Sequence, residues 1–170
     1  MKITIVVGNP KPQSRTLRVA VAVAEALFES TLPQGNVDPL ILDLADVASE
    51  LFNFESTTVE SLLTDVASSD LLVVASPTYK ATYTGLLKAF LDRYGNDALS
   101  GTVAVPVMTG AAPIHALAPE VYLRSLLVEL GASIPSRGIY ITESQLDDLD
   151  SIVASWAIQA KPLIEHALMI

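Results

Sequence analysis

The chain has 170 residues, which is enough for one domain with a substantial core and too few for two ordinary domains. Its formal net charge of −9 argues against nucleic acid and anionic membrane surfaces as partners, because both require a basic surface. It contains no cysteine, which excludes a disulfide scaffold, a thiolate metal site and a cysteine nucleophile. Any redox chemistry must therefore come from a bound cofactor.

Apolar residues make up 51% of the chain, but no uninterrupted run approaches the roughly 20 residues that a membrane-spanning helix needs. We expect no membrane association, and the excess of apolar residues favours a homo-oligomer. The amino terminus enters the first strand directly and lacks the form of a signal peptide, so the expected location is the cytoplasm.

The first element is a short, largely β-branched strand that stops at Gly8, as buried parallel strands do at their carboxyl edge. A helix is predicted from about Ser14 to Thr31, with Ser14 or Thr16 as its cap. The intervening loop adds Lys11 and Arg15, so hydroxyls, cations and a helix N-terminus converge, which suits a phosphate. The alternative is an ordinary turn whose polar residues are solvated or capping.

This loop is neither a Walker loop nor the Gly-x-Gly-x-x-Gly dinucleotide fingerprint. A cofactor with a terminal phosphate monoester therefore fits better than a pyrophosphate. Further along, residues 37–44 are predicted to form a second strand, and Phe52 and Phe54 are expected to fill the core. The spacing Thr57-x-x-Glu60 predicts a capping box that opens a helix ending near Ser69.

A second polar loop follows the buried strand at residues 71–75, which Ser76-Pro77 halts. It carries two tyrosines, a lysine and three hydroxyls before a helix over residues 86–91. A third loop, residues 109–113, follows a strand predicted at residues 101–108, in which Pro106 should face an edge or a bulge.

The remaining elements are a helix from His115 to Leu130, a strand over residues 133–141, and a helix that reaches Leu168 with a cap at Ser144-x-x-Asp147. Strand and helix thus alternate five times, which predicts an α/β fold with a doubly wound parallel sheet. Ligands of such sheets bind at the carboxyl ends of the strands, where the three polar loops should meet.

Flavin mononucleotide (FMN) fits such a meeting of loops. Its phosphate suits the first loop, and its ring suits the other two. The segment Pro77-Thr78-Tyr79 can offer the N–H groups that follow its proline to the polar edge of the ring, with Tyr79 to flank it, and small residues at 110–112 allow the main chain to approach the ring.

Three segments, residues 8–16, 76–92 and 109–115, together resemble the NAD(P)H-dependent FMN reductase family, most closely the reductases that feed two-component sulfonate and desulfurisation monooxygenases. The resemblance implies one flavodoxin-like domain over residues 1–170, with strand order 2-1-3-4-5 and helices on both faces. It further implies FMN as cofactor, NADPH or NADH as hydride donor, a monooxygenase partner, and a homodimer or homotetramer formed through the helices over residues 86–91 and 115–130. The expected cofactor-binding residues are Asn9, Lys11, Ser14, Arg15, Thr16, Pro77, Thr78, Tyr79, Lys80, Thr109, Gly110 and Ala111.

Hydride transfer from nicotinamide to flavin requires stacking and distance but no acid–base side chain, so we assign no catalytic residue and no metal. A lone histidine such as His115 is more often packed or capping, and Asp147, Asp148 and Asp150 complement a helix dipole. The competing functions are an electron-carrier flavodoxin and an NAD(P)H quinone or azo reductase on the same fold.

Overall fold

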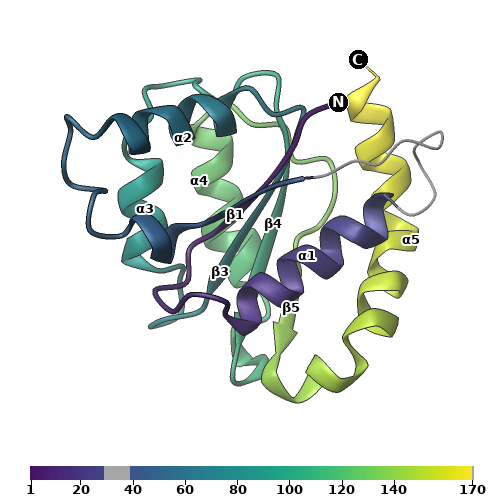
Figure 1. Cartoon of the computed structure of the whole chain (residues 1–170). Helices are drawn as coiled ribbons and strands as arrows, with labels where there is room; N and C mark the ends of the chain where they lie inside the picture. Colours follow the sequence, from purple (N-terminus) through teal and green to yellow (C-terminus); the bar gives the residue numbers. More distant parts are fainter. Residues whose placement is uncertain (29–38, 170) are drawn as a thin grey trace.

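A computed structural model describes residues 1–28 and 39–169 (Figure 1), in which a parallel sheet carries helices on both faces. The strands are β1 (Ile3–Val7), β2 (Leu40–Asp43), β3 (Leu71–Pro77), β4 (Val103–Gly110) and β5 (Ile139–Thr142). The α-helices are α1 (Arg15–Phe28), α2 (Thr57–Ala67), α3 (Gly85–Leu91), α4 (Arg124–Glu129) and α5 (Leu149–Leu168). Shorter helical turns are η1 (Leu44–Val47), η2 (Pro113–His115), η3 (Pro119–Leu123) and η4 (Glu143–Asp148).

The strand order is β2-β1-β3-β4-β5, and every neighbouring pair is parallel. This confirms the predicted order and the flavodoxin-like class, for which it is diagnostic. Successive side chains of a strand point to opposite faces of the sheet. The largely apolar strands β1, β3 and β4 therefore supply apolar side chains to both faces. All five residues of β1 and all seven of β3 are buried.

The two faces hold separate cores. On one, Ile5, Val73 and Val105 pack with α1 and α5, the two helices on the right of Figure 1. On the other, Val6 and Val74 pack with α2, α3 and α4. With helices on both faces, the sheet leaves its carboxyl edge for ligands.

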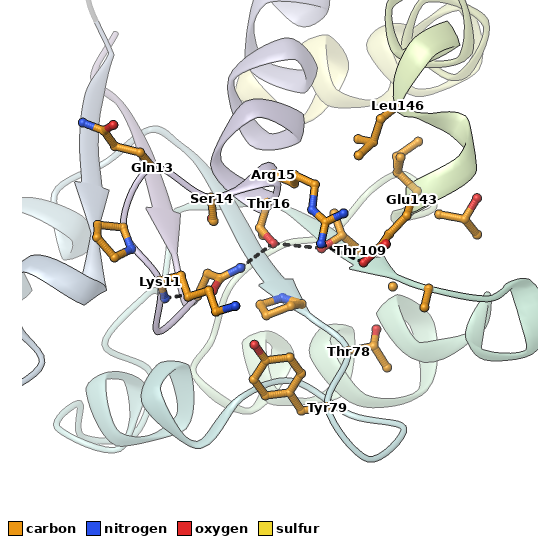
Figure 2. A pocket seen from close by; sticks show the side chains of 17 residues that line it. Lys11, Gln13, Ser14, Arg15, Thr16, Thr78, Tyr79, Thr109, Glu143 and Leu146 are labelled. Carbon is orange, nitrogen blue, oxygen red and sulfur yellow. Dashed lines mark hydrogen bonds and ion pairs between the residues drawn. The ribbon is translucent and has the colours of Figure 1, made fainter.

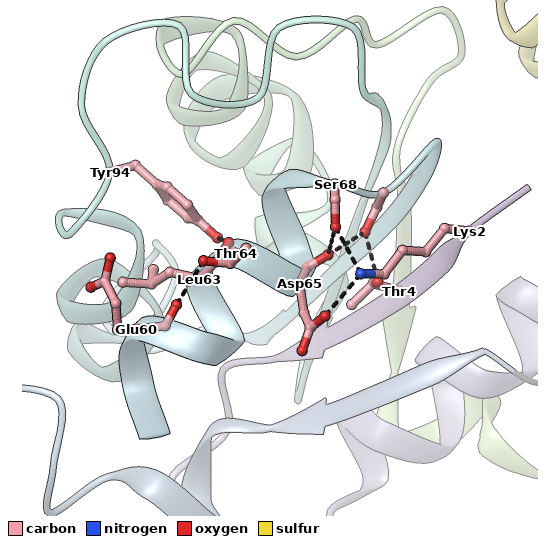
Figure 3. A network of polar contacts seen from close by, with 9 residues as sticks. Lys2, Thr4, Glu60, Leu63, Thr64, Asp65, Ser68 and Tyr94 are labelled. Carbon is pink, nitrogen blue, oxygen red and sulfur yellow. Dashed lines mark hydrogen bonds and ion pairs between the residues drawn. The ribbon is translucent and has the colours of Figure 1, made fainter. Parts of the chain in front are cut away.

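A polar network fixes the start of β1, at the edge of the sheet opposite to the strands' carboxyl ends (Figure 3). The Lys2 ammonium donates to Asp65 Oδ1 at 2.9 Å and to Ser68 Oγ at 2.7 Å. Beneath it, the Ser69 hydroxyl donates to Thr4 Oγ1 at 2.6 Å, and both residues are buried. The turn between α2 and β3 is thereby fastened to β1.

Pro106 lies inside β4, where a proline needs a gap in the ladder. The amide of Ala104 donates to the carbonyl of Ser133 at 2.8 Å, so the nitrogen of Pro106, two residues on, faces the same side. The ladder between β4 and β5 begins only at Val107 and Ile139. Pro106 therefore lies where β4 has no hydrogen-bonded partner on its β5 side, so its missing N–H faces a local edge, as predicted.

Two predictions for the first half of the chain are wrong. Phe52 and Phe54 do not fill the core: they are 79% and 74% exposed, and the guanidinium carbon of Arg93 lies 4.6 Å from the ring centre of Phe54. The cap of α2 is Ser56, whose side chain accepts from the amide of Val59, so Thr57 is already helical. Ser56 is preferred because its hydroxyl is buried and also donates to Glu50.

α1 begins one residue after the predicted Ser14, and the predicted part beyond residue 28 lies outside the described residues. Likewise β2 starts at Leu40, and residues 37 and 38 of the prediction lie outside the described part. The strands predicted at residues 71–75 and 101–108 both exist, but each ends two residues later than predicted, so Pro77 and Gly110 are the last residues of β3 and β4.

The predicted helix from His115 to Leu130 is broken. Prolines open each of its first two pieces, η2 at Pro113 and the π-helical η3 at Pro119, before α4 takes over at Arg124. Gly131 follows with a φ of +91°, which suits glycine after a helix end.

The predicted strand over residues 133–141 shrinks to β5, because only Ser133 pairs with β4 before Ile139. The predicted cap at Ser144 is also wrong. The capping box is formed by Thr142 and Gln145 and opens η4, and α5 follows only at Leu149.

Candidate functional site

The loop between β1 and α1 presents free hydrogen-bond donors at the N-terminus of α1. The hydroxyl oxygen of Ser14 accepts from the amide of Leu17 at 3.2 Å, which caps α1 and leaves the hydroxyl proton free to donate outward. The amides of Arg15 and Thr16 have no acceptor among residues 1–28 and 39–169. Unpaired amides and the positive end of a 14-residue helix give this loop the donors that an anion requires.

A chain of polar side chains ties this loop to the end of β4. The side-chain amide of Asn9 donates to Thr16 Oγ1 at 3.1 Å, and Thr16 Oγ1 lies 2.8 Å from Thr109 Oγ1. Asn9 and Thr16 are buried, and the Asn9 carbonyl oxygen accepts from the amide of Lys11 at 3.0 Å. The first and third predicted loops are thus in direct contact, as the dashed lines of Figure 2 show.

The loop after β3 folds back on itself before α3. Tyr79 and Thr82 exchange both backbone hydrogen bonds, at 2.8 and 3.3 Å, and the two residues between them have positive φ angles of 52° and 71°. Such two-residue turns normally contain Asn-Gly, and here they contain Lys80-Ala81. Tyr79 is held at the mouth of the site and is 47% exposed.

The cap of α3 connects that loop to the first one. The side chain of Thr84 accepts from the amide of Leu87 at 3.1 Å and donates to the carbonyl of Gly8 at 2.5 Å. A Cβ at Gly8 would lie 2.4 Å from Leu87 Cβ, so only glycine lets β1 and α3 approach this closely.

The end of β4 completes the site. The amide of Thr78 donates to the carbonyl of Thr109 at 2.7 Å, which aligns the second and third loops. A Cβ at Gly110 would lie 2.0 Å from the hydroxyl oxygen of Tyr140, which donates to the carbonyl of Ala112 at 3.0 Å. Thr78 Oγ1 is buried without a hydrogen-bond partner among the described residues.

These loops enclose a cavity of about 430 Å³ (Figure 2). All the predicted cofactor-binding residues line it except Lys80, which is exposed on the turn beyond Tyr79. Residues that the sequence did not single out also line it, namely Pro12, Gln13, Ile141, Thr142, Glu143 and Leu146. Four of these belong to the end of β5 and to η4, a fourth segment at the carboxyl edge.

Glu143 is the most consequential of the missed residues. Its Oε1 lies 2.9 Å from the guanidinium Nη2 of Arg15, the residue predicted to hold a phosphate. Its place directly after a parallel strand was the signal available in the sequence. The backbone amide of Gln13 also has a carboxylate partner: it donates to Oδ2 of Asp43, at the end of β2, at 3.0 Å.

His115 lies elsewhere, in a shallow hollow lined by Ile114, Leu117 and Tyr122. Within the described ranges, His, Asp and Glu side chains do not gather in groups of three that could hold a metal ion. Nor does any helix in those ranges have the length and apolar character needed to cross a membrane.

The fold and the site together define a flavodoxin-like protein with a ligand cavity at the carboxyl edge of its sheet. A solved structure of an NADH:FMN oxidoreductase (EMOB) in its apo form superimposes with a TM-score of 0.80, at 27% identity over 99% of this chain and 88% of that one. The sequence model of the NADPH-dependent FMN reductase family matches residues 1–147.

The chain belongs to the NADPH-dependent FMN reductase family, which confirms the predicted family. It is 33% identical to "FMN reductase (NADPH)" of Pseudomonas aeruginosa, over 86% of this chain and 80% of the relative. It is 29% identical to the NADH-dependent FMN reductase SfnE of Pseudomonas putida, over 99% of this chain and 91% of the relative.

Proposed function

We propose that this chain is an NAD(P)H:FMN oxidoreductase, a single flavin-binding domain that holds FMN in the cavity between β1, β3, β4 and β5. The proposal rests on family membership and on one structural observation. Loops far apart in sequence enclose one cavity whose donors lack acceptors in the described chain, at α1 and at Thr78. Cations and the N-terminus of α1 lie at one end of the cavity, and apolar and aromatic residues line the other, as a flavin nucleotide requires.

The phosphate end is the N-terminus of α1. The free amides of Arg15 and Thr16 and the hydroxyl proton of Ser14 would donate to phosphate oxygens, with the Lys11 ammonium nearby. Because the whole chain carries a net charge of −9, this local cluster of donors is needed to hold a dianion.

The ring end lies between the second and third loops. Pro77, Thr78, Tyr79, Gly110 and Ala111 line this end of the cavity, so these residues would hold the ribityl chain and the ring. The amides of Thr78 and Tyr79 already donate to the carbonyls of Thr109 and Thr82, so the predicted donation of their N–H groups to the ring is wrong. The unpartnered Thr78 hydroxyl fits this position, because a buried polar group without a partner costs about 1–3 kcal/mol that a ligand can recover.

FMN supplies the redox chemistry, by accepting hydride from NAD(P)H. The chain's own task is to position the ring and to leave one face of it open to the nicotinamide, so no titratable side chain needs to act. The half-exposed Tyr79 borders the entrance. We infer that FMN is exchangeable, and that reduced flavin leaves for a flavin-dependent monooxygenase.

The activity is tested by adding NADPH, and separately NADH, to the FMN-loaded protein without oxygen. The absorbance of the oxidised flavin should disappear after mixing with NADPH or with NADH. A protein that binds FMN but stays oxidised with both nucleotides would be an electron carrier, and the reductase proposal would be rejected.

The phosphate assignment is tested by Arg15→Ala, which should raise the Kd for FMN at least about tenfold, or about 1.4 kcal/mol for a lost charge-assisted contact. Arg137→Ala is the matched control. It removes the same charge at an exposed position that does not line the cavity. Equal Kd values for wild type and Arg15→Ala would remove Arg15 from the site.

We also propose that the chain forms a homodimer or homotetramer through α3 and α4. Support comes from the segment leading into α4, where Ile114, Leu117 and Val121 are 83%, 62% and 54% exposed. Val121→Asp should yield a smaller species in light scattering coupled to size exclusion. Ile158→Asp, at a 77% exposed position on α5, should not.

A further inference from the structure

We propose that Glu143 competes with the flavin phosphate for Arg15 and thereby lowers the affinity for FMN. The inference rests on the proposed function, because it concerns the same cavity. Arg15 is the only arginine among the residues that line this cavity, and its guanidinium faces a carboxylate there. Figure 2 shows the two side chains meeting between the N-terminus of α1 and η4.

The ion pair occupies a group that a phosphate would use. Arg15 Nη2 and Glu143 Oε1 are 2.9 Å apart, an ion pair at contact distance. A phosphate on the free amides of Arg15 and Thr16 would therefore meet a guanidinium already engaged. The phosphate would also bring its negative charge close to that of the Glu143 carboxylate.

The backbone holds Glu143 in this position. Both the amide and the hydroxyl of Thr142 donate to Gln145 Oε1 at 2.9 Å, which fixes the start of η4. Further along, the carbonyl of Leu146 accepts from the guanidinium of Arg18 at 3.1 Å, which ties η4 to α1. The backbone at Glu143 is thus held on both sides, and this places the carboxylate beside Arg15.

The pair is nevertheless weak enough to open. The side chains of Arg15 and Glu143 are 63% and 51% exposed, and exposed ion pairs stabilise a fold only slightly. A ligand with a dianionic phosphate can therefore take Arg15 over, at a cost in affinity. An FMN site with a built-in competitor releases its flavin readily, which suits an enzyme whose reduced product must leave.

The test measures Kd values by titration calorimetry at low ionic strength, for FMN and for riboflavin, which has no phosphate. Glu143→Gln keeps the shape of the side chain and removes its charge. It should lower the Kd for FMN about fivefold, equivalent to about 1 kcal/mol, and leave the Kd for riboflavin unchanged. The gain should shrink at 1 M salt, where the Debye length is only about 3 Å.

Asp147→Asn is the matched control. Asp147 is exposed on the same η4 turn but does not line the cavity, so its variant makes the same change in net charge without touching Arg15. It should leave the Kd for FMN unchanged. In an Arg15→Ala background the gain from Glu143→Gln should be smaller, because no guanidinium remains to be released.

Three outcomes overturn the inference. An unchanged FMN affinity in Glu143→Gln would show that the carboxylate is irrelevant to binding, and a weaker affinity would show that Glu143 holds Arg15 in place for the phosphate. Equal gains with riboflavin would point to the ring end. In each case wild-type protein would still bind and reduce FMN, whereas failure of the wild type to bind FMN would reject the proposed function itself.

Discussion

Gly8 is the position where a single methyl group should do most harm. In Gly8→Ala the new Cβ would lie 2.4 Å from Leu87 Cβ and 3.2 Å from Leu87 Cα. Carbon atoms prefer about 3.5–4.0 Å, so the shortfall is at least about 1 Å. Because Leu87 is fully buried and two of the three nearest atoms are its Cα and Cβ, no change of rotamer relieves the clash.

α3 must therefore move away from β1. That displacement strains the hydrogen bond from Thr84 to the Gly8 carbonyl, at 2.5 Å. Overpacking costs up to about 3 kcal/mol and a lost buried hydrogen bond about 1 kcal/mol, so we expect a loss of about 4 kcal/mol. For a chain of this size the melting temperature should fall by about 8 to 16 °C.

The assay is urea unfolding followed by far-ultraviolet circular dichroism, with Gly85→Ala as the matched control. Gly85 is the exposed first residue of α3, and a Cβ there meets nothing within 4 Å. That variant should be as stable as the wild type or up to about 1 kcal/mol more stable, since alanine favours helix. If Gly8→Ala unfolded at the same urea concentration as Gly85→Ala, the close approach of β1 and α3 would be wrong.

Three further variants test single features. Ala81→Gly should raise the free energy of unfolding by about 1 kcal/mol, seen as a higher urea midpoint, because alanine is strained at a φ of 71°; no gain would mean that the turn is not left-handed. Thr78→Val should raise the melting temperature of the flavin-free protein and weaken FMN binding in titration calorimetry, because it removes a buried hydroxyl without a partner in the described chain; tighter FMN binding would exclude that hydroxyl from the site. Burial raises the pKa of Tyr94 above its ordinary 10.0, so the folded chain keeps a proton that the unfolded chain loses, and stability should fall as the pH rises past about 10. The stability of Tyr94→Phe should fall less steeply with pH than that of the wild type, in unfolding curves measured from pH 9 to 11. Identical slopes for the two proteins would refute this assignment.

Features encoded by neighbouring residues were predictable. The strand at residues 3–7 and its halt at Gly8 follow from a β-branched run and a glycine, and the Ser14 cap follows from a hydroxyl ahead of an apolar helix. The convergence of three loops follows from topology, because parallel strands place their carboxyl ends along one edge.

Features set by contacts between distant segments could not be predicted from the sequence. Whether Phe54 enters the core depends on where the loop meets Arg93, some 40 positions along the chain. The choice of Ser56 over Thr57 as cap depends on Glu50. The pairing of Arg15 with Glu143 joins opposite ends of the chain, and no local pattern carries it.

The hydroxyls of Thr16 and Thr109, 2.8 Å apart, join the start of α1, which follows β1, to β4, although β3 runs between β1 and β4 in the sheet. Neither turn can swing outward without severing this bridge. The two walls of the cavity are therefore expected to open together or not at all, and amide exchange of the two turns should slow in parallel when flavin is added.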